Sequence, residues 1–230
     1  MKKSGKSLKT AAIIFMGATA AMNLLGGIGT TCAAFSNNVG YKMAFRDLLD
    51  YRWLYQGLVV TTTIVGLFGI WATVQLVRGD SKIYKNSLII LVVGTILGGV
   101  QFFASQTLRG KAVPANVKFY INLFTLILFL LFGLPGIREK INFSNKEKNM
   151  DKTTAAGFTA ILAGALMLTV FFWAGPSHTF FGENWTYVFF WPLVTTGTVL
   201  ISGGMVTLGW VVKEALQEPE PAKIRQISSL

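Results

Sequence analysis

Six long stretches of the chain contain no charged residue, and no other feature limits the fold as strongly. Each is long enough for the ~20 apolar residues that a helix needs to cross a hydrocarbon core of about 30 Å. Buried helices of soluble proteins are normally shorter and keep a polar face. We therefore predict an all-α polytopic membrane bundle of six transmembrane helices, over residues 9–29, 54–78, 86–107, 118–137, 154–174 and 188–212.

Composition and the carboxyl-terminal sequence set the domain organisation. Charged residues make up 13% of the 230-residue chain, whereas a soluble domain carries about a quarter, so most of the surface is expected to face lipid. Residues 1–218 are predicted to form one transmembrane domain. The Glu-Pro-Glu-Pro segment starts a tail, residues 219–230, that is predicted to be disordered in the cytoplasm.

The distribution of Lys and Arg predicts the orientation. With the Lys-rich amino terminus inside, 15 basic residues fall on cytoplasmic segments and 6, including Lys118, on outer loops. This asymmetry follows the positive-inside rule and predicts that both ends are cytoplasmic. The basic cytoplasmic segments are expected to attract anionic lipid headgroups. The net charge of +11 therefore does not require a nucleic-acid partner. We expect a multi-pass protein of the bacterial cytoplasmic membrane.

Two features lie around the first predicted span. Ala18-Thr19-Ala20 resembles a signal-peptide cleavage site, but residues 9–29 are interpreted as a retained transmembrane helix. In the first outer loop, Tyr41, Phe45 and Leu48 recur at helical spacing opposite Lys42, Arg46 and Asp47. This pattern predicts a short amphipathic helix on the outer surface or an extension of the second span.

Polar residues within the predicted spans are uncharged. Asn23 and Gln101 are the deepest, and interhelical hydrogen bonds are the favoured interpretation for them. Gly94 and Gly98 form a GxxxG pair that predicts close helix packing. Without a buried charge, a proton relay or a voltage sensor is not expected. The single cysteine, Cys32, excludes an intrachain disulfide and a Cys-based metal site.

Aromatic residues concentrate at the outer ends of the last two predicted spans. An interfacial belt is the simpler explanation. The alternative is a surface that binds a partner, a lipid, a quinone or a pigment, and no cofactor is predicted beyond such contacts. The candidate residues are Trp173, His178, Phe180, Phe181, Trp185, Tyr187 and Trp191.

Three functions are compatible with this pattern. The favoured one is a non-catalytic subunit or scaffold of a larger membrane complex, with other membrane proteins as partners. The alternative is a transporter or binding component for an uncharged or apolar solute, with a cavity lined by Gln56, Thr61, Thr62, Gln101, Thr195 and Thr196. An enzyme is least favoured, because no catalytic carboxylates, nucleophile or metal ligands stand at a recognisable spacing.

Overall fold

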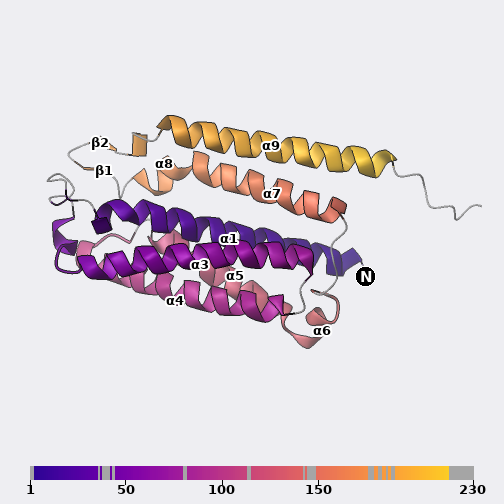
Figure 1. The fold of residues 1–230 in the computed structure, drawn as a ribbon, viewed down its shortest axis with the longest axis horizontal. Helices are drawn as coiled ribbons and strands as arrows, with labels where there is room; N and C mark the ends of the chain where they lie inside the picture. Colours follow the sequence, from indigo (N-terminus) through magenta and orange to yellow (C-terminus); the bar gives the residue numbers. More distant parts are fainter. Residues whose placement is uncertain are drawn as a thin grey trace, which may run out of the picture.

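The computed structural model describes residues 3–35, 37, 42, 45–79, 82–112, 115–141, 143, 149–175, 179–180, 183–184, 186–187 and 190–217. Four long helices that run alternately up and down form a bundle: α1 (Lys3–Phe35), α3 (Arg52–Arg78), α4 (Ile83–Arg109) and α5 (Ala115–Phe132). Figure 1 shows them side by side, with α1 packed on α3 and on α5, and α4 packed between α3 and α5.

A second unit lies against one side of this bundle. It consists of α7 (Asn149–Leu168), α8 (Val170–Trp173) and α9 (Phe190–Gln217), with a short antiparallel pair of strands, β1 (Thr179–Phe180) and β2 (Glu183–Asn184), between α8 and α9. α7 contacts α1, and α9 packs on the far side of α7 (Figure 1). We call α7 and α9 the hairpin.

Glycine and proline set several helix ends. Gly79 and Gly110 follow α3 and α4 with φ of 76° and 65°, and their amides bond to Gln75 and Gln106. This left-handed conformation suits glycine, which has no Cβ to clash. The short helix α6 (Pro135–Arg138) starts at a proline, and Pro192 lies in the first turn of α9, where a missing amide hydrogen costs nothing.

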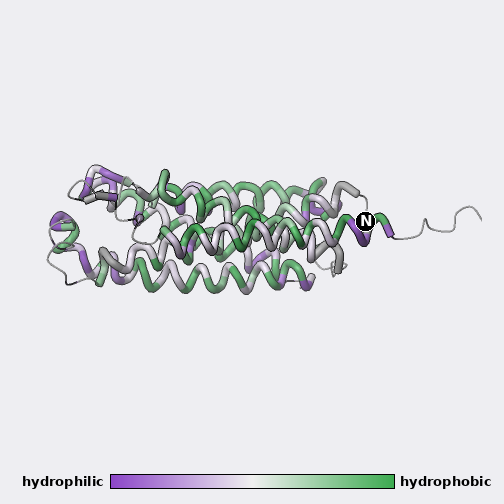
Figure 2. Tube along the Cα trace, turned by 90° about the horizontal axis from the view of Figure 1, so that it is seen from above, coloured by the Kyte–Doolittle hydropathy of each residue, from purple (hydrophilic) through white to green (hydrophobic). Residues whose placement is uncertain are grey.

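Among the described residues, five helices are long and apolar enough, by length and composition, to cross a membrane: α1, α3, α4, α5 and α9. Figure 2 shows hydrophobic residues along their length and hydrophilic residues mainly near the two ends. The predicted span 154–174 corresponds to α7 and α8, which are separated at Thr169, and its apolar part covers only Thr153–Leu168. The all-helical membrane architecture is thus confirmed, and the sixth crossing is not.

Apolar side chains fill the two ends of the bundle unequally. The larger cluster lies toward the amino-terminal end of α1 and includes Met16, Leu76, Leu91 and Phe129. A smaller one at the opposite end joins Ala34, Phe45, Leu48, Tyr55 and Val59. In this second cluster a 3₁₀ turn, η1 (Arg46–Leu48), inserts Leu48 into the bundle.

Between α1 and α3, the described residues include Lys42, in a helical conformation, and η1 farther along, while residues 41, 43 and 44 of the predicted amphipathic helix lie outside them. Phe45 and Leu48, two residues of the predicted apolar face, are buried against α1 and α3. Tyr41 lies outside the described residues, as do His178, Phe181, Trp185 and the predicted tail, 219–230.

Candidate functional site

The interior of the bundle contains a buried lysine, and this corrects the prediction that the spans carry no charge. Lys118 was predicted to lie in an outer loop. It lies instead in the first turn of α5, and only 2% of its surface is exposed. Its aliphatic stem passes Gly26 of α1, where an added Cβ would lie 2.9 Å from Lys118 Cδ. The absence of a side chain at Gly26 leaves room for the lysine. Lys9, in α1, is buried as well.

The amine of Lys118 joins three helices. Lys118 Nζ donates to Thr62 Oγ1 of α3 at 3.2 Å and to Gln101 Oε1 of α4. Gln101 Nε2 in turn donates to Thr30 Oγ1 of α1 at 3.0 Å. From Arg52 to Thr62, α3 rises by about 15 Å, so the amine lies well inside the bundle.

Two asparagines continue these contacts toward the amino-terminal end. Asn23 and Asn122 exchange two hydrogen bonds of 3.0 Å, and Asn122 Nδ2 also donates to Lys118 O at 2.8 Å. Gly94 of α4 faces Asn122, and a Cβ at Gly94 would collide with Asn122 Oδ1. Gly98, the other glycine of the predicted pair, lies against the backbone of Phe119, so both glycines face α5.

Further pairs extend this polar core in both directions. The hydroxyls of Thr19 and Thr125 lie 2.8 Å apart, and those of Tyr55 and Ser105 lie 2.9 Å apart nearer the end that contains η1. We call the whole set the polar network; its members are Thr19, Asn23, Thr30, Tyr55, Thr62, Gln101, Ser105, Lys118, Asn122 and Thr125. It extends from the larger apolar cluster to the smaller one, which also contains Tyr55.

A buried amine of this kind is costly and is therefore a candidate functional group. Among the described residues, no carboxylate lies within 4.0 Å of Lys118 Nζ, so oxygen atoms of uncharged side chains provide its contacts. The arrangement can hold an acceptor-rich or anionic group if the bundle opens. Within the same part of the chain, no three His, Cys, Asp or Glu residues could hold a metal ion together.

The six residues of the predicted cavity occupy different surroundings. Thr62 and Gln101 meet through Lys118. Gln56 instead donates to Ala34 O at 3.1 Å, and Thr61 is exposed and bonds to Gly57 O of its own helix. Thr195 and Thr196 are exposed on α9, which lies on the far side of α7 from the bundle. The structure therefore does not bring the six together.

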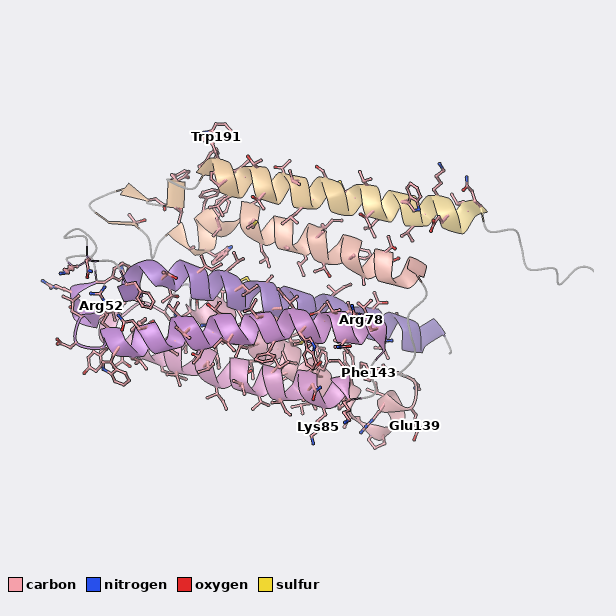
Figure 3. The ribbon with its side chains drawn as sticks, viewed as in Figure 1. Arg52, Arg78, Lys85, Glu139, Phe143 and Trp191 are labelled. Carbon is pink, nitrogen blue, oxygen red and sulfur yellow. The ribbon has the colours of Figure 1, made fainter. Side chains whose placement is uncertain are left out.

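Part of the predicted aromatic surface is described. Tyr187 stacks on Phe171 at 5.2 Å, and Phe190 meets Trp191 edge to face. Trp191 is 74% exposed and points away from the bundle (Figure 3). Trp173 is half-buried and donates from Nε1 to Leu166 O at 3.3 Å. Phe180 lies in β1, paired with Glu183.

Four glycines hold the hairpin together, and the sequence pattern indicated only one of them, Gly164, as a packing residue. Gly157 and Gly164 of α7 face Gly204 and Gly197 of α9, and an added Cβ on Gly164 or Gly204 would lie 2.6 Å from the opposite carbonyl oxygen. We call these four residues the glycine seam. Both pairs are spaced by seven residues, which is two helical turns. Small residues four apart include Ala160 and Gly164, but this spacing does not pair the four glycines.

The other side of α9 is uncovered over its whole length within the described structure. Val199, Val206 and Trp210 are among its most exposed large residues. Thr195, Ser202 and Gly209 are exposed on the same side, because seven-residue steps keep residues on one face. Comparison of the chain with protein-family models, with curated proteins and with solved structures gives no match.

Proposed function

We propose that the chain is a non-catalytic subunit of a larger membrane complex and that the uncovered face of α9 binds another membrane protein. The main support is that, in the described structure, α9 packs mainly on α7, while its other face is exposed. That face carries Thr195, Ser202 and Gly209 at the seven-residue spacing that the glycine seam uses. Small residues permit close helix approach in lipid, where hydrophobic exclusion gives no driving force.

We also propose six crossings with both ends in the cytoplasm of a bacterial cell. α1 begins and α9 ends at the same end of the molecule (Figure 1), which requires an even number of crossings. From Asn149 to Trp173, α7 and α8 together rise by about 37 Å, enough to span the hydrocarbon core. Single cysteines at Lys140 and Lys213, in a chain with Cys32→Ser, should react only from inside, and one at Lys111 only from outside. Labelling of Lys140 and Lys213 from opposite sides would refute this arrangement.

Particle mass tests the subunit proposal. In mild detergent, the protein mass of the particle, corrected for bound detergent, should exceed that of one 25.1 kDa chain. Light scattering measures this mass, and mass spectrometry should show a fixed stoichiometry of subunits. Gly209→Leu should reduce this association, because a Cβ there meets nothing within 4 Å among the described residues and only a partner could oppose it. Gly57→Leu, at an equally open glycine on α3, is the matched control. A monomeric wild-type particle would contradict the proposal.

Lys118 supports a second candidate function, a binding component for a solute. Its amine and the surrounding amides and hydroxyls would suit an anionic or acceptor-rich solute better than an apolar one. Because Lys118 is 2% exposed, such binding requires the bundle to open. Reductive methylation followed by mass spectrometry tests this opening in membranes. Exposed Lys111 is the positive control, and complete protection of Lys118 over hours would exclude the second candidate.

A further inference from the structure

An apolar groove of about 440 Å³ runs between α3 and α4 on the outside of the bundle. Ile64 and Phe68 of α3 form one wall, Ile89 and Val93 of α4 form the other, and Val65 lies between them. α5 and α1 pack elsewhere on these helices, so the groove faces the hydrocarbon of the membrane. A groove left unfilled would lose dispersion contacts, and an acyl chain is the matching occupant.

The groove becomes polar toward the end where α1 begins. At that end the groove is lined by Trp71 and by Asn86, which has an amide side chain. Arg78 follows Trp71 by seven residues and therefore lies on the same face of α3. Lys82 and Lys85 each precede a lining residue of α4, Asn86 or Ile89, by about one turn.

Three basic side chains thus surround the inner end of an apolar groove. Arg78, Lys82 and Lys85 are exposed, and Figure 3 shows Arg78 and Lys85 at this end of the molecule. Basic residues at a membrane surface attract anionic headgroups, and Arg and Lys bind phosphate through charge-assisted hydrogen bonds. The combination of apolar walls and a basic end is complementary to one amphiphile with an anionic head.

We propose that this groove is a specific site for one anionic phospholipid. An acyl chain lies against Ile64, Phe68, Ile89 and Val93, and the headgroup phosphate lies among Arg78, Lys82 and Lys85 beside the Asn86 amide. This site is independent of the α9 face, since α9 lies on the far side of α7 from the bundle that contains α3 and α4 (Figure 1).

Native mass spectrometry of the full chain, delipidated in a neutral detergent, tests the proposal. One dioleoyl phosphatidylglycerol molecule should bind more tightly than dioleoyl phosphatidylcholine. Arg78→Gln with Lys85→Gln should weaken phosphatidylglycerol binding about 25-fold, at roughly fivefold for each basic residue. Lys111→Gln, which removes an exposed lysine at the other end, should leave it unchanged. Glycerol 1-phosphate, a headgroup without tails, should not compete.

A second pair of variants tests the groove itself. Ile89→Trp should fill the groove and weaken binding of both lipids, whereas Ile96→Trp, at an exposed residue of α4 outside the lining, should not. The thermal midpoint without lipid should stay near that of the wild type for all variants, because the changed residues are exposed. Equal binding of the two lipids, or no difference between Ile89→Trp and Ile96→Trp, would overturn the proposal. Insensitivity to added lipid, as expected if a protein helix filled the groove, would overturn it too.

Discussion

The four-helix bundle and the hairpin hold their helices together in different ways. In the bundle, side chains from α1, α3, α4 and α5 meet, and part of the interior is a polar network around Lys118. In the hairpin, α7 and α9 approach so closely that glycine backbones touch. The bundle surrounds its polar groups on all sides, whereas the hairpin leaves one face of α9 open. The difference supports the proposal that the hairpin, through the open face of α9, binds a partner.

Gly204→Leu should give the largest effect. An added Cβ would lie 2.6 Å from the carbonyl oxygen of Gly157, which is backbone and cannot swing aside. We expect α7 and α9 to separate, with a loss of about 3 kcal/mol in unfolding free energy, measured by steric trapping with labels on the hairpin. Gly203→Leu is the matched control, since a Cβ there meets nothing within 4 Å among the described residues. Equal stability of the two variants would show that the seam is not close-packed.

Lys118→Ala should come next, with a loss of about 2–3 kcal/mol. It removes the stem that packs against Gly26, as in other large-to-small core changes, and leaves Gln101 and Thr62 without their donor. Lys118→Met removes the buried amine as well but keeps an apolar stem against Gly26, so it should cost less than Lys118→Ala. If the two variants were equally stable in an equilibrium unfolding titration, packing of the stem would not be what holds this part of the bundle.

The double-mutant cycle of Asn23→Ala and Asn122→Ala should give a coupling of about 1 kcal/mol, because the two amides exchange hydrogen bonds. Combining either variant with Gly204→Leu should be additive, since sites without shared partners usually are. A strong non-additivity would instead mean that the bundle and the hairpin unfold as one unit.

Thr19→Val should give the smallest effect, about 0.6 kcal/mol, from loss of the 2.8 Å bond to Thr125. Thr207→Val is its control, because Thr207 Oγ1 bonds only within its own helix, to Gly203 O at 2.7 Å, in the described structure. The same unfolding titration measures both. Identical losses would assign the Thr19 effect to helix propensity and not to contact between helices.

Charge-free runs predicted the helical membrane architecture because lipid demands long apolar helices, and the edges of α3 and α4 agree closely with the predicted spans. The same reasoning misplaced Lys118. A charged residue was treated as the end of a span, although a lysine stem is long enough to carry its amine back into the core. Gly26 and Gln101 were visible in the sequence, but only the three-dimensional structure places them against the stem and the amine of Lys118. The aromatic residues were also visible, yet nothing in their spacing indicated the uncovered face of α9.

The Asn23–Asn122 pair has a consequence for how the chain is made. The two residues are 99 positions apart, which corresponds to about 5–20 s of synthesis at 5–20 residues per second. During that interval α1 is already inserted and Asn23 has no asparagine opposite it in the bilayer. In the hairpin, α7 and α9 are consecutive long helices of the chain, so α9 meets its partner α7 soon after it emerges. Biogenesis of the bundle should therefore depend on α1 being shielded until α5 arrives, while the hairpin can assemble without delay.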